Sequence, residues 1–383
     1  MAAYFDHNAT TPLHEKVLEA MLPYMGQVCG NPSSLHRFGR LQRDAIEQAR
    51  EQVALLVGAQ ASQVIFTSGG TEANNLMIKG LCSDPGVRRI AVSEIEHMSL
   101  LEPAGAVAAA GCTVDRIAVN QQGIVTLDAL QQVMKNEPSL VSVMAANNET
   151  GAIQDIEKLA AAANTRGIWF HTDASQIAGK QAFSFKQAGV HAMTLSAHKL
   201  YGPMGAGALI IDKSLPLRPL LQGGSQEKGL RAGTENVPAI VGFGMAAELA
   251  RLELHERADH VRVLRDTLEK QLQQFEVVQV FSNQVERLPN TLQFGVMGFE
   301  GETLLMELDR RGFAVSSGSA CTSGKTEASH VLKAMAIPNE LAISSIRVSL
   351  GQTNTMAEIE CFVEAIRQII EIKNSSVMMA ANL

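Results

Sequence analysis

Short apolar runs alternate with amphipathic or alanine-rich stretches between residues 60 and 215. Runs of aliphatic and β-branched residues predict strands, and apolar residues at three- and four-residue spacing predict the helices between them. The predicted strands are Gln63–Thr67, Arg89–Ser93, Thr113–Ala118, Ser139–Ala145, Ile168–Asp173, Ala192–Ser196 and Gly207–Ile211, and the predicted helices are Glu72–Leu81, Ser99–Ala110, Leu127–Lys135 and Asp155–Arg166.

This alternation predicts an α/β unit with a mostly parallel, seven-stranded sheet and helices on both of its faces. A short glycine-rich turn joins the last two strands, so we expect part of the sheet to be antiparallel. In sheets of this kind, ligands bind near the C-terminal ends of the strands. Residues that directly follow the predicted strands are therefore the first candidates for chemistry.

The pattern changes after residue 235, and the change predicts a second domain. A chain of 383 residues is long enough for two domains. We expect a large domain over residues 12–257 and a smaller α+β domain formed by residues 1–11 and 258–383, with the last residues, from 374 on, frayed. The elements predicted in this half are a long helix Glu235–Gln274, strands Val277–Phe281 and Asn290–Val296, a helix Thr303–Arg311, a strand Ser345–Leu350 and a helix Met356–Glu371.

Composition and charge narrow the classes of function. Hydrophobic residues make up 46% of the chain and charged residues 19%, as in folded globular proteins. The formal net charge of −7 gives no reason to expect nucleic acid or a membrane as a partner. No apolar stretch is long enough to span a bilayer, and the first residues do not resemble a signal peptide. The five cysteines are odd in number and lack CxxC spacing, which argues against a disulfide framework or a zinc site and favours a reducing, cytoplasmic location.

Two charged residues lie at the C-terminal ends of predicted strands or shortly after them. Lys199 comes directly after the strand that ends at Ser196, where an amine can form a Schiff base, although most lysines are simply solvated. Asp173 ends the preceding strand, where its carboxylate can pair with a protonated pyridine nitrogen or, alternatively, cap the segment that follows. Either residue alone is a weak indication.

Glycines and hydroxyl residues over Thr67–Glu72 predict an anion site. The segment follows a strand and opens a helix, where free N–H groups and the helix dipole face an anion such as a phosphate. It matches neither GxGxxG nor GxxxxGK[ST], and by itself the pattern is weak. Ser196, His198 and Thr234 are further candidate phosphate donors.

Three more residues carry candidate chemistry. His97 lies just past a strand, where it can stack on a planar ring and move protons, or cap a helix. Cys321 lies among small residues that predict a loop, on which a thiol can travel between substrate and partner. Arg347 lies on a predicted strand, and its guanidinium suits the capture of an amino-acid carboxylate. Three other cysteines fall in helix or strand patterns and are expected to be inert and buried: Cys82, Cys112 and Cys361.

Together these segments resemble the cysteine desulfurases of the NifS and IscS type, within the class-V aminotransferase group of fold-type I pyridoxal-phosphate (PLP) enzymes. The resemblance implies PLP as the cofactor, L-cysteine as the substrate, a homodimer, and a sulfur-acceptor protein such as an iron–sulfur scaffold as a partner. It covers nearly the whole chain and rests on Asp6–Pro12, Gly30–His36, Ser68–Glu72, Asn147–Gly151, Asp173–Gln176, His198–Lys199, Arg231–Asn236 and Ser316–Ser323.

The resemblance also implies roles for residues that would surround the ring of the cofactor. Lys199 would hold PLP and remove the Cα proton of the substrate. His97 would stack on the ring, Asp173 would pair with the pyridine nitrogen, and Gln176 would bond the phenolic oxygen.

Further roles concern the phosphate and the substrate. Asn148 and Arg347 would orient the carboxylate of the substrate. Cys321 would attack its sulfur, leaving alanine and a persulfide. The phosphate would be held by residues of this chain and one residue from the second subunit: Gly70, Thr71, Ser196, His198 and, from the second subunit, Thr234.

Several alternatives stay open at this point. A selenocysteine lyase or another class-V aminotransferase would share the lysine, the aspartate and the phosphate cradle, and Cys321 is what separates an aminotransferase from a desulfurase. A scaffold without catalysis is disfavoured because every proposed catalytic residue is present, and a nicotinamide dehydrogenase because GxGxxG is absent. No metal site is predicted, apart from transient ligation of an iron–sulfur cluster by Cys321.

Overall fold

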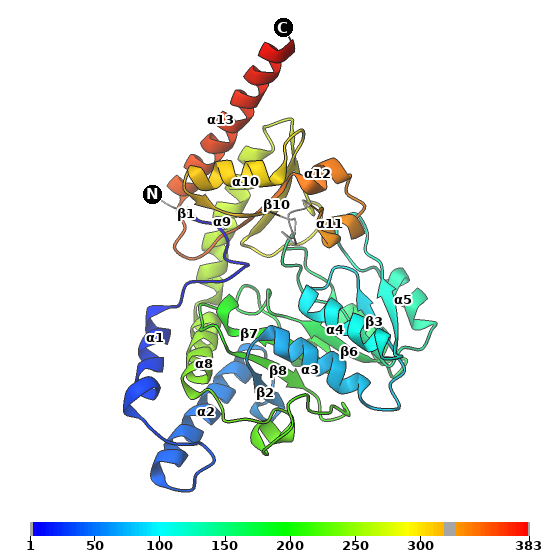
Figure 1. Cartoon of the computed structure of the whole chain (residues 1–383), viewed down its shortest axis with the longest axis vertical. Helices are drawn as coiled ribbons and strands as arrows, with labels where there is room; N and C mark the ends of the chain where they lie inside the picture. The colour runs from blue at the N-terminus through cyan, green and yellow to red at the C-terminus, as the bar shows by residue number, and fades with distance from the viewer. Residues whose placement is uncertain (1–2, 318–326, 382–383) are drawn as a thin grey trace.

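The computed structural model describes residues 3–317 and 327–381. Figure 1 shows a large sheet with its helices in the lower part of the view and a smaller sheet above it. The last helix, α13 (Met356–Ala381), projects away from the upper part. In the described part of the chain, no helix combines the length and the apolar character that crossing a membrane requires.

The large sheet has the seven strands that the sequence predicted, and their order is β2-β8-β7-β6-β5-β3-β4. All neighbouring pairs are parallel except those made by β8, which is antiparallel to both β2 and β7. The antiparallel part therefore lies where the glycine-rich turn predicted it. The strands are β2 (Val64–Thr67), β3 (Arg89–Ser93), β4 (Thr113–Ile117), β5 (Leu140–Ser142), β6 (Trp169–Asp173), β7 (Ala192–Ser196) and β8 (Gly207–Ile211).

Helices cover both faces of this sheet, also as predicted. Side chains alternate between the faces along each strand: Ile90 and Val92 pack into the core under α3 and α4, whereas Ala91 packs into the opposite core. The first face carries α3 (Gly70–Cys82) and α4 (Met98–Ala109), and the second carries α1 (Glu15–Leu22), α2 (Arg37–Leu56), α5 (Leu127–Met134), α6 (Ile156–Asn164), α7 (Phe185–Ala188) and α8 (Val237–Leu252). Shorter helical turns are η1 (Pro23–Gln27), η2 (Ala61–Gln63), η3 (Ala197–Lys199) and η4 (Gln226–Gly229).

The smaller sheet is antiparallel, in the order β12-β13-β10-β9. The N-terminal strand β1 pairs in parallel with β11, so the first residues of the chain lie in this part of the molecule. The elements are β1 (Ala3–Tyr4), β9 (Val278–Val280), β10 (Thr291–Val296), β11 (Phe313–Ala314), β12 (Ser316–Ser317) and β13 (Ser345–Ser349), with helices α9 (Leu254–Leu272), α10 (Gly301–Arg310), α11 (His330–Ala334), α12 (Asn339–Ile343) and α13.

Two predictions about helices were wrong. The helix expected over Glu235–Gln274 is two helices, α8 and α9, separated at Glu253. The two helices pack into different cores. The apolar side chains of α8 are buried in the core of the large sheet, whereas Val261, Leu264 and Leu268 of α9 are buried in the core of the smaller one. The tail expected to fray continues as helix α13 to Ala381. The division into domains at residues 12 and 257 stays a prediction.

Candidate active site

A cleft of about 680 Å³ lies at the C-terminal ends of β6 and β7, beside the start of α3. Its walls come from the loop after β5, from the N-terminal segment Asn8–Thr10, and from Arg347 on β13. The cleft therefore lies between the large and the smaller sheet. Ten of the residues selected from the sequence line it: Gly70, Thr71, His97, Asn148, Asp173, Gln176, Ser196, His198, Lys199 and Arg347.

Lys199 ends the short helical turn η3 that follows β7, and this position points its amine into the cleft. Its Nζ donates hydrogen bonds to the backbone carbonyls of Asn8 and Ala9, each at 2.6 Å. Burial and, to a smaller extent, the positive charge of Arg347 lower the pKa of Lys199 to about 8, against the opposing effect of Asp173. A substantial fraction of the amine is thus neutral near pH 8, as a nucleophile or base requires.

Asp173 ends β6, and both oxygens of its buried carboxylate accept hydrogen bonds. Oδ2 accepts from Asn74 Nδ2 at 2.8 Å, and Oδ1 accepts from the backbone N–H of Ser175 at 2.9 Å. The second bond is the turn-capping role that the sequence left open, while the first fixes the carboxylate from α3. The two bonds hold the carboxylate at the wall of the cleft.

The anion cradle is built where β8 approaches the start of α3. A Cβ on Gly207 would lie 2.5 Å from the backbone carbon of Gly69, so only glycine permits this approach. A Cβ on Gly70 would come within 3.3 Å of Ser175 Oγ and 3.4 Å of Ser196 Cβ. The N–H groups at the first turn of a helix have no acceptor within the helix. The cradle therefore combines free N–H groups, hydroxyls and the positive end of α3.

His97 is the N-cap of α4, since its Nδ1 accepts from the backbone N–H of Ser99 at 3.1 Å. The ring also lines the cleft, so the two roles considered from the sequence are compatible. Burial by the surrounding protein lowers the pKa of His97, although the carboxylate of Asp173 opposes this. His198 contacts Thr10 Oγ1 through Nδ1 at 3.1 Å, and burial lowers its pKa to about 4. Both rings are accordingly neutral near pH 7.

Arg347 enters the cleft from the smaller sheet with its guanidinium held by oxygen acceptors. Nη2 makes a salt bridge of 2.7 Å with Asp6 and donates to Ser316 Oγ at 3.0 Å. Nη1 donates to the backbone carbonyl of Asn148 at 3.2 Å. Nε is buried and has no partner within the part of the chain that the structure describes.

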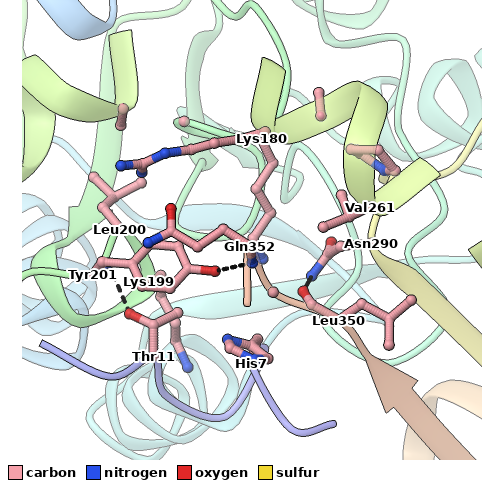
Figure 2. A pocket seen from close by; sticks show the side chains of 16 residues that line it. His7, Thr11, Lys180, Lys199, Leu200, Tyr201, Val261, Asn290, Leu350 and Gln352 are labelled. Atoms are coloured by element: carbon pink, nitrogen blue, oxygen red, sulfur yellow. Dashed lines mark hydrogen bonds between the residues drawn. The ribbon is translucent and has the colours of Figure 1, made fainter. Parts of the chain in front are cut away.

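The sequence reasoning missed residues behind the cleft. A second cavity, of about 40 Å³, is lined by His7, Lys180 and Lys199 (Figure 2). Lys180 Nζ donates to Gln176 Oε1 at 2.8 Å and to Asn8 Oδ1 at 2.9 Å. Burial, followed by the charge of Lys199, holds the pKa of Lys180 well below its ordinary value. The spacing of four residues between Gln176 and Lys180 was the available signal.

Two predicted site residues are not part of this cleft as the structure describes it. Thr234 is exposed and does not line the cleft of its own chain, so its contribution to a second subunit stays a prediction. Cys321 lies outside the described residues, and the neighbouring Ser316, on β12, is held by Arg347 Nη2 and donates to Asp6 Oδ1 at 2.9 Å.

Comparisons with known proteins agree with this arrangement. The model of the class-V aminotransferase family matches residues 3–362. A protein of Dictyoglomus turgidum named cysteine desulfurase IscS is 43% identical over 373 residues, which cover 96% of this chain and 94% of that protein. A solved structure described as a NifS-like protein has a TM-score of 0.91 and 37% identity, and the match covers 97% of this chain and 100% of that one. A structure of SspA in complex with cysteine has a TM-score of 0.80 and 31% identity, with coverage of 92% and 99%.

Proposed function

The chain belongs to the class-V aminotransferase family, and from this premise we propose that it is a cysteine desulfurase that uses pyridoxal phosphate. The observation that carries the proposal is the cleft, in which Lys199, Asp173 and Arg347 converge from two sheets. The curated relative that shares 43% of its residues over 96% of this chain is named for the same activity. The proposed reaction takes sulfur from L-cysteine and leaves L-alanine.

The residues of the cleft fit the proposed cofactor. Gly70, Thr71 and Ser196 line the cleft together at the start of α3, and a Cβ on Gly70 would crowd Ser175 Oγ at 3.3 Å and Ser196 Cβ at 3.4 Å, so free N–H groups and hydroxyls can meet an anion there. Lys199 Nζ would attach to the aldehyde of PLP, and Asp173 would face the ring nitrogen. When bound there, PLP withdraws electrons from the Cα of an amino acid. Gly70, Thr71, Ser196 and His198 would hold the phosphate.

The protein's own groups bind the substrate and move protons. Arg347, which lines the cleft, would receive the carboxylate, while Asp6 keeps the guanidinium in place. Lys199 Nζ would take up and return the proton at Cα, which its pKa of about 8 permits near neutral pH. His97 Nδ1 is occupied by the N–H of Ser99, so Nε2 is the nitrogen left to exchange a proton in the cleft. The thiolate of Cys321 would take the sulfur as a persulfide.

The wider context of the activity is also part of the proposal. We propose a cytoplasmic homodimer that passes sulfur to an acceptor protein, such as an iron–sulfur scaffold. Free cysteines at Cys29 and Cys361 support a reducing compartment. Thr234 is exposed and does not line the cleft of its own chain, which agrees with the contribution to a second subunit that the resemblance implies.

The decisive experiment incubates purified protein and PLP with L-cysteine and a thiol reductant, and measures alanine and sulfide. Wild type should form both products in equal amounts. Cys321→Ala should form neither above background, whereas the control Cys361→Ala, at an exposed cysteine that does not line the cleft, should keep the wild-type rate. Mass spectrometry after one turnover should find the added sulfur on Cys321. Alanine and sulfide formation by Cys321→Ala at the normal rate, or added sulfur on Cys361, would reject the desulfurase assignment.

A further inference from the structure

A second pair of sulfur atoms lies outside the cleft. Cys82 is the last residue of α3, and Cys112 directly precedes β4. Their Sγ atoms are 3.8 Å apart, in contact with each other. Both side chains are partly exposed, and Cys361 is exposed, so the prediction that these three cysteines are buried was wrong. The pattern of each segment could not reveal the contact, because 30 residues separate the two cysteines in the sequence.

The sulfur pair borders a surface cleft with a positive rim. The same cleft is lined by Lys79, Ser83 and Arg88. The nearby carboxylate of Asp84 is paired with Arg218 at 3.8 Å. Small anions are therefore attracted to this cleft, more strongly at low ionic strength than at high.

The two cysteines lie at, or just beyond, the far ends of the two helices that begin at the candidate active site. α3 starts at Gly70 in the anion cradle and ends at Cys82, and α4 starts after His97 and leads into Cys112. Apolar side chains of the two helices share one core, which holds their ends side by side. A bond between the sulfur atoms would thus lock two elements that the site needs in a fixed position.

We propose that Cys82 and Cys112 form a redox site, which small anionic disulfides oxidise to an intramolecular disulfide. In the first step the thiolate of Cys112 attacks a disulfide RSSR, which forms the mixed disulfide at Cys112 and releases one thiolate RS⁻. In the second step the sulfur of Cys82 attacks that of Cys112, and the proton of Cys82 goes to the second RS⁻ as it leaves. Two protein thiols are oxidised, and RSSR is reduced to two thiols.

The contact between the sulfur atoms favours the second step, and the burial of Cys82 determines which thiol attacks first. Because the two sulfur atoms are already in contact at 3.8 Å, they need to approach each other by less than about 2 Å to reach bonding distance. Burial, followed by the neighbouring Cys112, raises the pKa of Cys82 to about 12. Cys82 is therefore protonated near neutral pH, which leaves the first attack to Cys112.

The test uses the Cys29→Ser/Cys361→Ser variant, which removes the other two exposed cysteines of the described chain. The protein is incubated with glutathione disulfide, which is anionic, or with cystamine, which is cationic, and its tryptic peptides are mapped without reduction. We expect a cross-linked pair of peptides, 80–88 and 90–116, that is lost on reduction. It should form several-fold faster with glutathione disulfide, and added salt should reduce this difference. A failure to form the cross-link would overturn the proposal, and equal rates with the two reagents would overturn the preference for anions.

Two single variants separate this site from accidental oxidation. Cys82→Ser should accumulate the mixed disulfide at Cys112, because no second thiol is present to resolve it. Cys112→Ser should form little adduct at Cys82. An adduct at Cys82 as abundant as that at Cys112 would overturn the proposed order of attack. These measurements need no bound cofactor and no turnover, so they do not depend on the proposed function.

Discussion

Substitution of Asp173 by asparagine separates the charge of this residue from its hydrogen bonds. The asparagine can keep its oxygen toward the N–H of Ser175 and place its amide nitrogen where Oδ2 now accepts from Asn74. Two amide donors would then face each other. Asn74 can relieve this by turning over its own amide, because its Oδ1 is buried and has no partner in the described structure. The turned amide also moves Nδ2 away from Ser99 Oγ, to which it now donates at 2.9 Å, and leaves this buried nitrogen without an acceptor, so we expect a loss of about 1–2 kcal/mol in the free energy of unfolding.

The expected loss of activity is much larger. A carboxylate in contact with a positive charge is worth about 4 kcal/mol at an effective dielectric constant of 20. If Asp173 keeps the cofactor's ring nitrogen protonated, this energy is lost in the rate-determining transition state. The corresponding decrease in kcat is about 10³-fold. Alanine formation at saturating L-cysteine and PLP gives kcat, and urea denaturation gives the stability.

Asp212 provides a matched control on the same sheet. It follows β8, and its Oδ1 accepts from the backbone N–H of Ser214 at 2.8 Å, which is the turn that Asp173 makes with Ser175. Asp212 does not line the cleft, so Asp212→Asn should leave kcat unchanged. A kcat of Asp173→Asn within about threefold of wild type, near 0.65 kcal/mol in barrier, would show that Asp173 is only a turn cap.

Two further predictions concern Lys199 and His7. Lys199→Ala should still bind PLP through the cradle but lose borohydride-stable labelling and alanine formation, and labelling at any other lysine would contradict the assignment. His7 is buried with both ring nitrogens unpartnered in the described structure, and burial lowers its pKa to about 4. The unfolded chain therefore binds more protons between pH 6.5 and about 4, so the free energy of unfolding should fall as the pH drops through this range. Urea denaturation of His7→Asn should show a smaller fall, and an unchanged fall would refute this account.

The sequence predicted those parts of the fold that depend on local pattern. Each of the seven strands of the large sheet was found within a few residues, because buried strands are marked by short β-branched runs. The break at Glu253 was missed because both halves of Glu235–Gln274 have helical spacing. The helix is interrupted there because the residues before Glu253 pack into the core of the large sheet and those after it pack into the core of the smaller sheet. This difference exists only in the folded chain.

The site residues were predictable where a reactive or anion-binding group lies at the end of a predicted strand, as at Asp173, Lys199 and the start of α3. It was not predictable where partners come from distant segments. Asn74 fixes Asp173 from 99 positions away, and Asp6 holds Arg347 from 341 positions away. Neither partner has a local pattern that indicates its role, since each is a single polar residue in an ordinary helix or loop.

Asn8, in the N-terminal segment Asp6–Pro12, shows how a residue without a catalytic role can position the catalytic groups. The backbone carbonyl of Asn8 accepts from Lys199 Nζ at 2.6 Å and Gln176 Nε2 at 3.0 Å, and both residues follow strands of the large sheet. Its side chain accepts from Asn290 Nδ2 at 3.1 Å and donates to Thr291 Oγ1 at 2.8 Å, both from the smaller one. Asn8 thus ties the proposed catalytic lysine to the sheet that carries the substrate-binding arginine. The charge of Arg347 contributes to the lowered pKa of Lys199, so Asn8 connects the parts of the molecule that carry these two interacting groups. That is a physical reason for the first residues of the chain to belong to the site.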